Sequence, residues 1–503
     1  MFGGLTKTSS RIAIAAAFGL LLCGFAFKAT PAQAADLGGD CCADLEERVA
    51  ELEATTVRKG NKKVSVTLSG WVVKSMNVWD DGHESSFVVG DKDYDLATRF
   101  AITGSATIAP GWSGGFNITV TAPGTTFGIS NNQVDEFFSV NSRFFGTSFG
   151  AIDTLYSYIY IKSDHWGTLN WGHLSPASDN PAVLADISGT VIESNFVWFE
   201  GGGFFLRPNG AAGFTGAIWN DFALCSSAIA PGVDCFGTAQ PAVRYDSPTW
   251  GGFRFEASFG TADVVPAILD TTAGYLNNNV FRIHPPTRDS HFADIALFYT
   301  ADWNSIKISL AGAYTWMESN PLNGGQEDYW QLGGSIMHKP SGLGVYAMGS
   351  WEDVDAAENG KCDNIFPGLP GCLVPGPQLG GQALPDTDAW GVKPFWRKAW
   401  SPIGTTVLYG EFGQYNDMFG LALANGSINT LPACATGNCF VTDSQAERWG
   451  LGVVQEIDSA AMHLWTRWQH QELDVDLLDS NGVRSSQGFD DFDIYQVGGI
   501  IFF

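Results

Sequence analysis

The sequence ends on FDIYQVGGIIFF, residues 492–503, and this stretch has a two-residue period. Counted back in steps of two from the last residue, one parity is apolar apart from a glycine: Phe503, Ile501, Gly499, Val497 and Tyr495. The other parity carries the polar Gln496. A strand points alternate side chains to opposite faces of its sheet. The stretch therefore predicts a half-buried strand that continues to the final residue.

The beginning of the sequence has the features of a secretory signal peptide. Lys7 and Arg11 precede an apolar run at 12–27, and Ala32-Gln33-Ala34 offers small residues for cleavage. We expect residues 1–34 to be removed, so that the mature chain begins at Ala35. The alternative, a retained membrane anchor, is disfavoured because the apolar run is short for a span.

Charge and composition narrow the class of protein. Residues 1–34 carry three of the 27 Lys and Arg, which leaves 24 basic against 53 acidic residues, a balance of −29. This excess of acid argues against nucleic acid as a partner. Aromatic residues make up 13% of the chain, glycine is abundant, and long apolar runs are few. An all-β protein is expected, either a secreted soluble β-sandwich or a transmembrane barrel.

Eight cysteines remain after cleavage, and six of them form close pairs. Each pair would close a small loop in an oxidising compartment. We favour disulfides over metal binding because no histidine cluster accompanies the cysteines. Neighbouring cysteines rarely bridge each other, so Cys41 and Cys42 are open to an intermolecular bond or to free thiols. The predicted disulfides are Cys225–Cys235, Cys362–Cys372 and Cys434–Cys439.

A short helix is predicted within residues 35–60. Apolar and small residues recur there at steps of three and four and form a heptad seam flanked by glutamates. One interpretation is a solvated amphipathic helix, since the pattern covers only about two heptads. The other is a helical bundle on the axis of an oligomer. The seam consists of Cys42, Leu45, Val49, Leu52 and Thr56.

From residue 61 onward the pattern alternates, and short and long connections alternate strictly. Seven short turns lie at 109–115, 163–167, 246–252, 301–304, 339–342, 401–404 and 458–460. Eight long connections lie at about 80–93, 123–152, 174–239, 261–291, 317–328, 352–387, 416–444 and 472–488. Seven short and eight long connections join 16 strands. Outer-membrane barrels have short periplasmic turns, long external loops and an even strand number.

Two further features agree with a barrel. All three close cysteine pairs fall in long connections, and several tryptophans lie at the short turns, where the indole ring suits a membrane interface. Residues 61–503 are therefore predicted to form a 16-stranded antiparallel transmembrane β-barrel, whose last strand pairs with the first because a barrel leaves no free edge. The expected interface girdle is Trp112, Trp166, Trp250, Trp303 and Trp400.

Several stretches resemble the porins of Gram-negative bacteria, in particular the alphaproteobacterial porin family. They include WGTLNWGHLSPASD (166–179), VRYDSPTWGGFRFEASFG (243–260), KPFWRKAWSPIGTTVLYGEFGQY (393–415) and WGLGVVQEIDSAAMHLW (449–465). The resemblance implies a homotrimeric, water-filled diffusion channel in the outer membrane. The last strand is similar to the signal that the barrel-assembly machinery reads, which would use Tyr495, Val497, Ile501 and Phe503.

Two departures from a minimal porin affect the expected architecture. The third connection, about 174–239, is long and contains VWFEGGGFF and GAIWND, which could add a hairpin and raise the strand number to 18. The heptad helix at 35–60 is also additional and resembles a periplasmic stalk that reinforces a trimer. The mature Ala-Asp start resembles that of barrels linked covalently to peptidoglycan, so Ala35 is a candidate attachment point.

No reaction can be assigned from motifs. The chain has no Gly-rich phosphate loop after a strand, no nucleophile elbow and no HExxH sequence. DKDYD at 91–95 starts like a calcium loop, but Leu96 replaces the required glycine. We therefore expect no enzymatic activity, no cofactor and no metal site. The acidic stretch is better read as an external loop, whose carboxylates could meet divalent ions that bridge lipopolysaccharide.

The porin resemblance implies that the third connection folds into the barrel and narrows it. Its carboxylates Asp179, Asp186 and Glu193 would then face lumen-pointing basic residues across the opening. The alternative is that these are ordinary lumen or loop charges away from a constriction. Strand parity nominates as pore-lining basic residues Arg99, Arg244, Arg254, Lys393, Arg397, Arg448 and Arg467.

The resulting hypothesis is a channel for passive diffusion of small hydrophilic solutes and ions. The acidic balance predicts weak cation preference. The alternatives are a solute-specific, sugar-type channel with Trp and Tyr platforms, a barrel that acts mainly as a peptidoglycan tether, and a secreted soluble β-sandwich.

Overall fold

The computed structural model describes most of the chain from residue 63 onward. The described residues are 63–92, 96–122, 132–133, 152–198, 200–211, 213–223, 239–261, 291–319, 325–355, 386–420, 422, 427–434, 439–479 and 482–503. The predicted signal peptide, the predicted heptad seam, Ala35, Cys41 and Cys42 lie outside them. No helix among the described residues is long and apolar enough to cross a membrane.

Within the described ranges, eighteen β-strands make up almost all the regular structure. They are β1 (Ser65–Asp80), β2 (Ser85–Gly90), β3 (Arg99–Ala109), β4 (Trp112–Thr121), β5 (Asp153–Ser163), β6 (Gly167–Leu174), β7 (Gln240–Asp246), β8 (Phe253–Thr261), β9 (His291–Trp303), β10 (Ile306–Ser319), β11 (Gly325–His338), β12 (Leu343–Asp355), β13 (Thr387–Ser401), β14 (Gly404–Asn416), β15 (Cys439–Ile457), β16 (Met462–Asp479), β17 (Arg484–Gly488) and β18 (Phe492–Phe502). The helical turns are α4 (Pro181–Leu184), α5 (Asn220–Ala223), η3 (Ser427–Thr430), η4 (Pro432–Cys434) and η5 (Asp458–Ala460).

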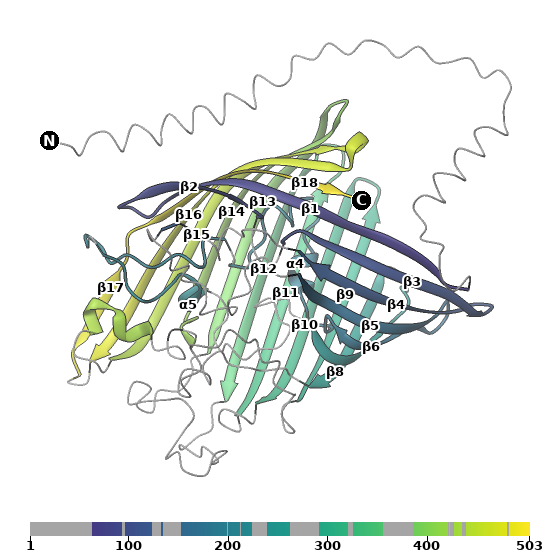
Figure 1. Ribbon diagram of the computed structural model, residues 1–503, viewed down its shortest axis with the longest axis horizontal. Helices are drawn as coiled ribbons and strands as arrows, with labels where there is room; N and C mark the ends of the chain where they lie inside the picture. Colours follow the sequence, from purple (N-terminus) through teal and green to yellow (C-terminus); the bar gives the residue numbers. More distant parts are fainter. Residues whose placement is uncertain are drawn as a thin grey trace.

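The strands form one closed antiparallel sheet. Figure 1 shows the last strand, β18, lying beside the first, β1, and the register runs from Trp71 opposite Phe502 to Asp80 opposite Asp493. Two further backbone bonds seal the seam, because Gly70 N donates to Phe503 O at 2.9 Å and Phe503 N donates to Gly70 O at 3.0 Å. The predicted closure is confirmed, and the sheet leaves no free edge at this seam.

The eighteen strands occupy 16 positions around the barrel. On one side, β1 pairs with β3 through residues 65–71 and with β2 through residues 75–80, so β2 and β3 are two parts of one interrupted strand. In the same way β16 pairs with both β18 and β17. The two extra strands are therefore outer extensions of the first and last hairpins. The connections expected at 80–93 and 472–488 are partly strand, because β1 continues to Asp80 and β2 begins at Ser85, while β16 continues to Asp479 and β17 begins at Arg484.

The described residues of the third connection contribute no barrel strand, so VWFEGGGFF and GAIWND do not supply the strands 17 and 18 that the sequence allowed. β6 ends at Leu174 and β7 begins at Gln240, so the predicted bounds of the connection are right. Within it, a small hairpin brings Phe205 opposite Ile218. This hairpin bonds to itself, since Leu206 N donates to Ala217 O at 2.9 Å, and it lies inside the barrel rather than in its wall.

The seven short turns lie where the sequence predicts them, at one end of the barrel. Local backbone geometry explains some of their residues. Gly342 has φ +78°, and a Cβ there would meet Arg397 O at 1.9 Å. Only glycine adopts this conformation without strain. The strand ends that lead into the long connections lie at the opposite end (Figure 1).

Large apolar side chains cover the outer face of the barrel. Leu68, Ile102 and Leu310 are exposed on it, whereas their strand neighbours point inward. Two rows of outward tryptophans bound this surface. The lower row, at the short turns, consists of Trp112, Trp166, Trp250, Trp303 and Trp400, and the upper row of Trp330, Trp351, Trp390 and Trp449.

The distance between the two tryptophan rows matches a membrane. Trp390 and Trp400 lie on the same strand, β13, ten residues apart. Ten residues of strand span about 33 Å, and a tilt of about 40° reduces this to about 25 Å along the barrel axis. The apolar band of an outer-membrane barrel has this height. The lower row was predicted; the upper row was not, because it lies within strands rather than at recognisable turns.

Candidate functional site

The described residues of the segment 175–223, called here the inner loop, run along the inside of the barrel wall. Figure 1 shows α4, which belongs to this loop, within the ring of strands. Hydrogen bonds to the strands of the wall fix successive parts of the loop. Ser178 N donates to Asp294 Oδ2 on β9 at 2.8 Å, Ala182 N to Gln331 Oε1 on β11 at 3.0 Å, and Ile187 N to Ser335 Oγ on β11 at 3.2 Å. The loop is thus built into the lumen as a lining layer.

Lys393 on β13 anchors the middle of the inner loop. Its ammonium lies 3.0 Å from Asp186 Oδ2 and 3.2 Å from Thr190 Oγ1, and it also donates to Ser194 O. Both charged side chains are fully buried. Removing one member of such a pair leaves a buried charge without compensation. Lys393 and Asp186 therefore hold the loop to the wall as a unit.

Two buried arginines hold the next part of the loop by its backbone. Arg448 on β15 donates to Val197 O at 3.2 Å and also to Asn195 O, while its guanidinium lies between the rings of Phe196 and Trp198. Arg467 on β16 donates to Glu193 O at 2.8 Å. The planar, five-donor guanidinium suits this task, because it can satisfy several carbonyl groups at once.

Carboxylates of the loop complete these anchors. Glu200 forms ion pairs with both Arg467 and Lys92, and all three side chains are buried. Glu193 accepts a hydrogen bond from His463 Nδ1 at 2.7 Å. Nearby, Arg397 donates to Ser188 O at 3.0 Å and pairs with Glu456 at 2.8 Å. Wall and loop are thus joined by a continuous row of charge-assisted contacts.

This geometry differs from the expected transverse field. Asp186 and Glu193 point toward the wall that carries the basic residues and are in contact with it, so they do not face those residues across an opening. Asp179 is bonded within the loop, to Ser175 and Asn180. The physical reason is burial, because a charge removed from water needs a partner in direct contact. Four of the seven predicted basic residues contact the body of the inner loop, after its first residue Ser175. They are Lys393, Arg397, Arg448 and Arg467.

The other three predicted basic residues line the opposite part of the wall. Arg99 on β3 lies over the Trp71 ring at 4.7 Å. Arg244 on β7 pairs with Asp246 at 2.7 Å and donates to Ser175 O at 2.7 Å. Arg254 on β8 pairs with Glu256 at 2.8 Å. The inner face of β3–β8 thus carries polar and paired charged groups on the side of the lumen away from most of the inner loop.

An apolar cluster fills the lumen near the long connections of β13–β18. Trp198 stacks on Trp219 with ring centroids 5.9 Å apart, and Phe204 packs against Phe492 at 4.7 Å. Inward residues of the wall here are also apolar, among them Leu473. Sequence alternation did not predict this cluster, because an apolar residue that points into the lumen has the same local sequence pattern as one that points toward lipid.

The hairpin turn after β1 is tied to the inner loop by an ion pair. Arg207 Nη2 lies 2.8 Å from Asp81 Oδ2, and both side chains are buried. Burial works against the charge of Asp81. Hydrogen bonds from Arg207, from the Gln133 side chain and from the backbone N–H groups of Glu84 and His83 outweigh this, and the pKa of Asp81 is lowered.

Of the predicted disulfide cysteines, Cys434 is disulfide-bonded. Its pairing with Cys439 stays a prediction. The other four cysteines of the predicted pairs lie outside the described residues.

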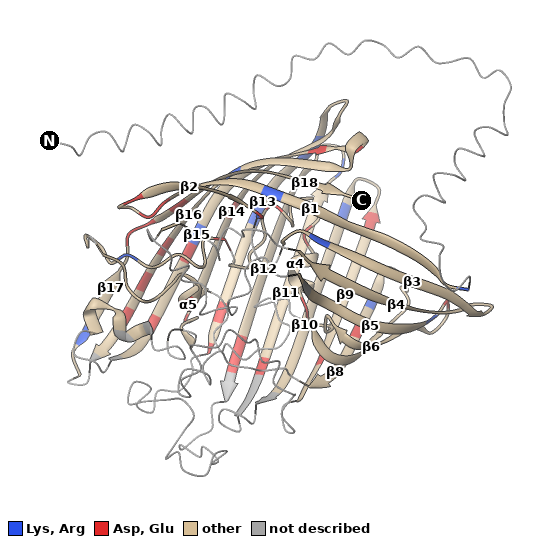
Figure 2. Ribbon diagram, in the orientation of Figure 1, with Lys and Arg blue, Asp and Glu red and all other residues tan. Residues whose placement is uncertain are grey.

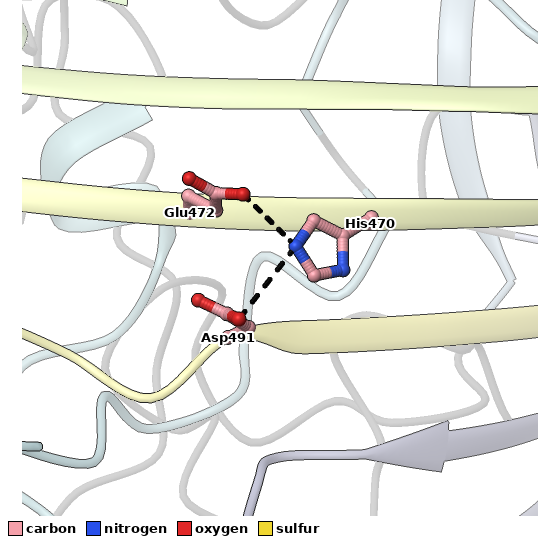
Figure 3. A group of neighbouring side chains, drawn as sticks. All are labelled: His470, Glu472 and Asp491. Carbon is pink, nitrogen blue, oxygen red and sulfur yellow. Dashed lines mark hydrogen bonds and ion pairs between the residues drawn. The ribbon is translucent and has the colours of Figure 1, made fainter.

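A histidine and two carboxylates gather on the outer face, above the upper tryptophan row. Figure 3 shows His470 with Glu472 and Asp491, and His470 Nε2 lies 3.1 Å from Glu472 Oε1 and 3.8 Å from Asp491 Oδ2. Atoms of these three side chains lie within 4.8 Å of one another, as metal ligands would. Exposed carboxylates often gather without an ion, and His470 Nδ1 is already 3.0 Å from Asp493.

Sequence reasoning missed several residues of the lumen network. The sequence did not indicate His463 and Lys92, which contact the inner loop from the wall side, or Glu200 and Arg207, which belong to the loop and form its ion pairs. Parity could have placed His463 on the inner face of β16. Its partner, Glu193, is 270 positions away in the sequence, so no local pattern indicates the contact.

A closed antiparallel barrel with two tryptophan rows and an inner loop defines an outer-membrane channel. A family model described as Gram-negative porin matches residues 15–462. The chain therefore belongs to the Gram-negative porin family and resides in the outer membrane. A comparison with curated proteins found no match.

Among solved structures, the chain is similar to OprB of Pseudomonas putida at 10% identity and TM-score 0.50, covering 95% of this chain and 100% of that chain. It is also similar to the anion-selective porin of Comamonas acidovorans at 13% identity and TM-score 0.48, covering 88% and 100%. The outer-membrane channel DcaP of Acinetobacter baumannii has 11% identity and TM-score 0.40, covering 88% and 99%. At these identities the likeness concerns the fold alone.

Proposed function

We propose that this porin lets small hydrophilic solutes and ions diffuse passively across the outer membrane. The observation that carries the proposal is the polar inner face of β3–β8, where Thr103, Asn117, Tyr158 and Tyr160 are partly exposed inside the barrel. A solute in water can exchange its hydration shell for these hydroxyl and amide groups. Liposome swelling with uncharged solutes of increasing size tests the proposal, and vesicles that swell no faster with the protein than without it would contradict it.

The channel is proposed to prefer cations weakly. Figure 2 shows many acidic residues toward the long-connection ends of the strands, and several of these, such as Asp328, Asp353 and Glu447, stand at outward positions. The lumen itself pairs its charges closely, as at Arg244 with Asp246 and Arg254 with Glu256. Paired charges leave little net field, so selectivity is small. Reversal potentials in asymmetric KCl should show slight cation preference, and clear anion preference would refute it.

The barrel is proposed to act as a homotrimer that contacts lipopolysaccharide through its outer belt. The heptad helix at 35–60 would form a periplasmic stalk after removal of residues 1–34, and the barrel-assembly machinery would read the terminal strand. Purified protein in mild detergent should elute with the mass of a trimer, and deletion of 35–60 should lower the temperature at which the trimer dissociates. A monomer under these conditions would contradict the proposal.

Two alternative functions are each supported by one observation. Tyr158 and Tyr160 stand at alternate positions of β5 on the inner face, an arrangement suited to a sugar-type channel, and saturable block of current by one sugar would favour it. The Ala35-Asp36 start favours a peptidoglycan tether. Mass spectrometry of muramidase digests would detect or exclude a linked N-terminal peptide.

A further inference from the structure

A recess of about 200 Å³ opens on the inner wall of β8, β9 and β10. It lies between the wall and the end of α4 in the inner loop. Its lining includes Leu184, Thr249, Arg254, Phe298, Thr300 and Ser309. The recess combines one cation, hydroxyl groups and apolar side chains, which is the usual make-up of a small-molecule site.

Arg254 is unlike the cations that hold the inner loop. Lys393, Arg448 and Arg467 are buried, whereas the Arg254 side chain is 40% exposed. Its guanidinium lies 4.3 Å from the centre of the Phe298 ring, and Nη1 is 2.8 Å from Glu256 Oε1. Stacking on one face and an ion pair at one end fix the orientation of the group. The exposed part of its edge is therefore presented to the recess in a fixed direction.

The remaining lining supports a ligand that has a polar and an apolar end. Thr300 and Ser309 are directly opposite each other on β9 and β10. Across the recess, Leu184 is 59% exposed at the end of α4. An exposed leucine inside a hydrated lumen is costly unless an apolar group covers it.

We propose that this recess is a subsite for small organic monocarboxylates with an apolar body. The proposal rests on the proposed channel function and adds a solute class to it. A carboxylate accepts hydrogen bonds from the guanidinium edge and from a hydroxyl group, while its apolar body covers Leu184 and the rim of Phe298. A dianion such as phosphate is disfavoured, since Glu256 already neutralises part of the Arg254 charge and repels a second negative charge.

Planar-bilayer recording with benzoate tests this subsite. With wild-type channels, benzoate should reduce the current in a saturable manner, and its neutral isostere benzamide should not. Arg254→Gln should require about tenfold more benzoate, because it loses a charge-assisted hydrogen bond to the carboxylate. The matched control is Lys162→Gln, which removes an exposed inner-face cation from β5 and should leave the benzoate effect unchanged.

A second variant keeps the test decisive if Arg254→Gln folds poorly. Leu184→Ser should weaken the effect of benzoate but not that of acetate, which has little apolar body. The subsite is refuted if benzoate does not reduce the wild-type current in a saturable manner, or if Arg254→Gln and Leu184→Ser both respond to benzoate as the wild type does. It is also refuted if Lys162→Gln loses as much sensitivity to benzoate as Arg254→Gln. A protein that gives no conductance in KCl refutes the channel function itself, which is a different outcome.

Discussion

At the scale of residues, the lumen is organised by cations that hold a loop against a wall. The contribution of Lys393 is the easiest to test, because its side chain and that of its partner Asp186 are both fully buried. Lys393→Met leaves the Asp186 carboxylate without its cation, at a cost of about 3–5 kcal/mol in the stability of the anchored loop. We expect a looser inner loop, seen as larger and noisier single-channel currents.

Two control variants distinguish the effect of breaking the Lys393–Asp186 ion pair from the effect of removing any positive charge from the lumen. Lys162→Met removes an exposed inner-face lysine and should leave current noise unchanged. The double variant Lys393→Met with Asp186→Leu replaces the pair by apolar groups and should recover most of the quiet current. Equal noise in wild type and Lys393→Met would show that the pair does not hold the loop.

The ion pair of Asp81 and Arg207 makes a second prediction at this scale. Because the pKa of Asp81 is lowered on folding, its contribution to stability is complete above about pH 4, the unfolded value, and is lost as the pH falls through the lowered pKa. Hydrogen exchange of residues 200–211 should therefore stay slow as the pH falls to about 4, after correction for intrinsic rates, and become faster only below it.

Asp81→Asn provides the control for this acid step. The variant should show fast exchange in the same segment at neutral pH and no further step on acidification. A wild-type transition between pH 5 and 7 would assign the step to another group.

Parity placed the predicted basic residues on the inner face but could not pair them. Lys393 alternates with outward Val392 and Pro394, a local signal that any strand provides. Its partner Asp186 is 207 positions earlier, in a connection without a repeating pattern. Which charge meets which depends on the path of the inner loop, and that path is decided by long-range packing.

At the scale of elements, closure depends on the terminal strand. Phe503 exchanges two backbone hydrogen bonds with Gly70, and the outward parity of β18 faces lipid. Deleting Phe503 removes both bonds at the seam and the last aromatic residue of the interface. We expect a lower yield of folded barrel, measured as the fraction that keeps the compact, heat-modifiable mobility on gels.

Phe503→Tyr keeps both backbone bonds and an interface aromatic, so it should assemble like the wild type. If deletion of Phe503 assembled with wild-type yield, the seam would not depend on the final residue.

The strands were predictable because alternation and turn residues are local signals. The interruptions between β2 and β3 and between β17 and β18 were not. Asp91, just after β2, is buried and pairs with Lys74 on β1, so the break is stabilised by tertiary contacts. From the sequence alone, a polar stretch of this kind predicts an external loop, because the tertiary contacts that order it leave no local pattern.

At the scale of the whole molecule, the water path is expected to run along β3–β8. The apolar cluster and the inner loop fill the side of β13–β18, and Leu473 is buried within that cluster. Cysteine placed at Asn117 should react with a charged thiosulfonate and reduce the current, whereas cysteine at Leu473 should not react. Equal block at both positions would show that water occupies the whole cross-section.

The strand number, the side of the short turns and the closure by β18 followed from the order of short and long connections. The apolar filling of one half of the lumen could not be predicted in this way. An inward apolar residue such as Leu473 has the same local sequence pattern as a residue that faces lipid. Alternation distinguishes two faces of a strand and cannot tell which medium each face meets.

Along β3–β8, the side of the barrel that carries the proposed water path, outward residues meet hydrocarbon and their inward neighbours meet water. Ile102 and Thr103 are neighbours on β3, the first outward and the second inward. Spin labels at these positions, in a background with Cys41 and Cys42 replaced by serine, can be compared in lipid for collision with oxygen and with a water-soluble nickel chelate. We expect oxygen access at 102 and nickel access at 103; nickel access at 102 with none at 103 would show that the two faces are assigned the wrong way round.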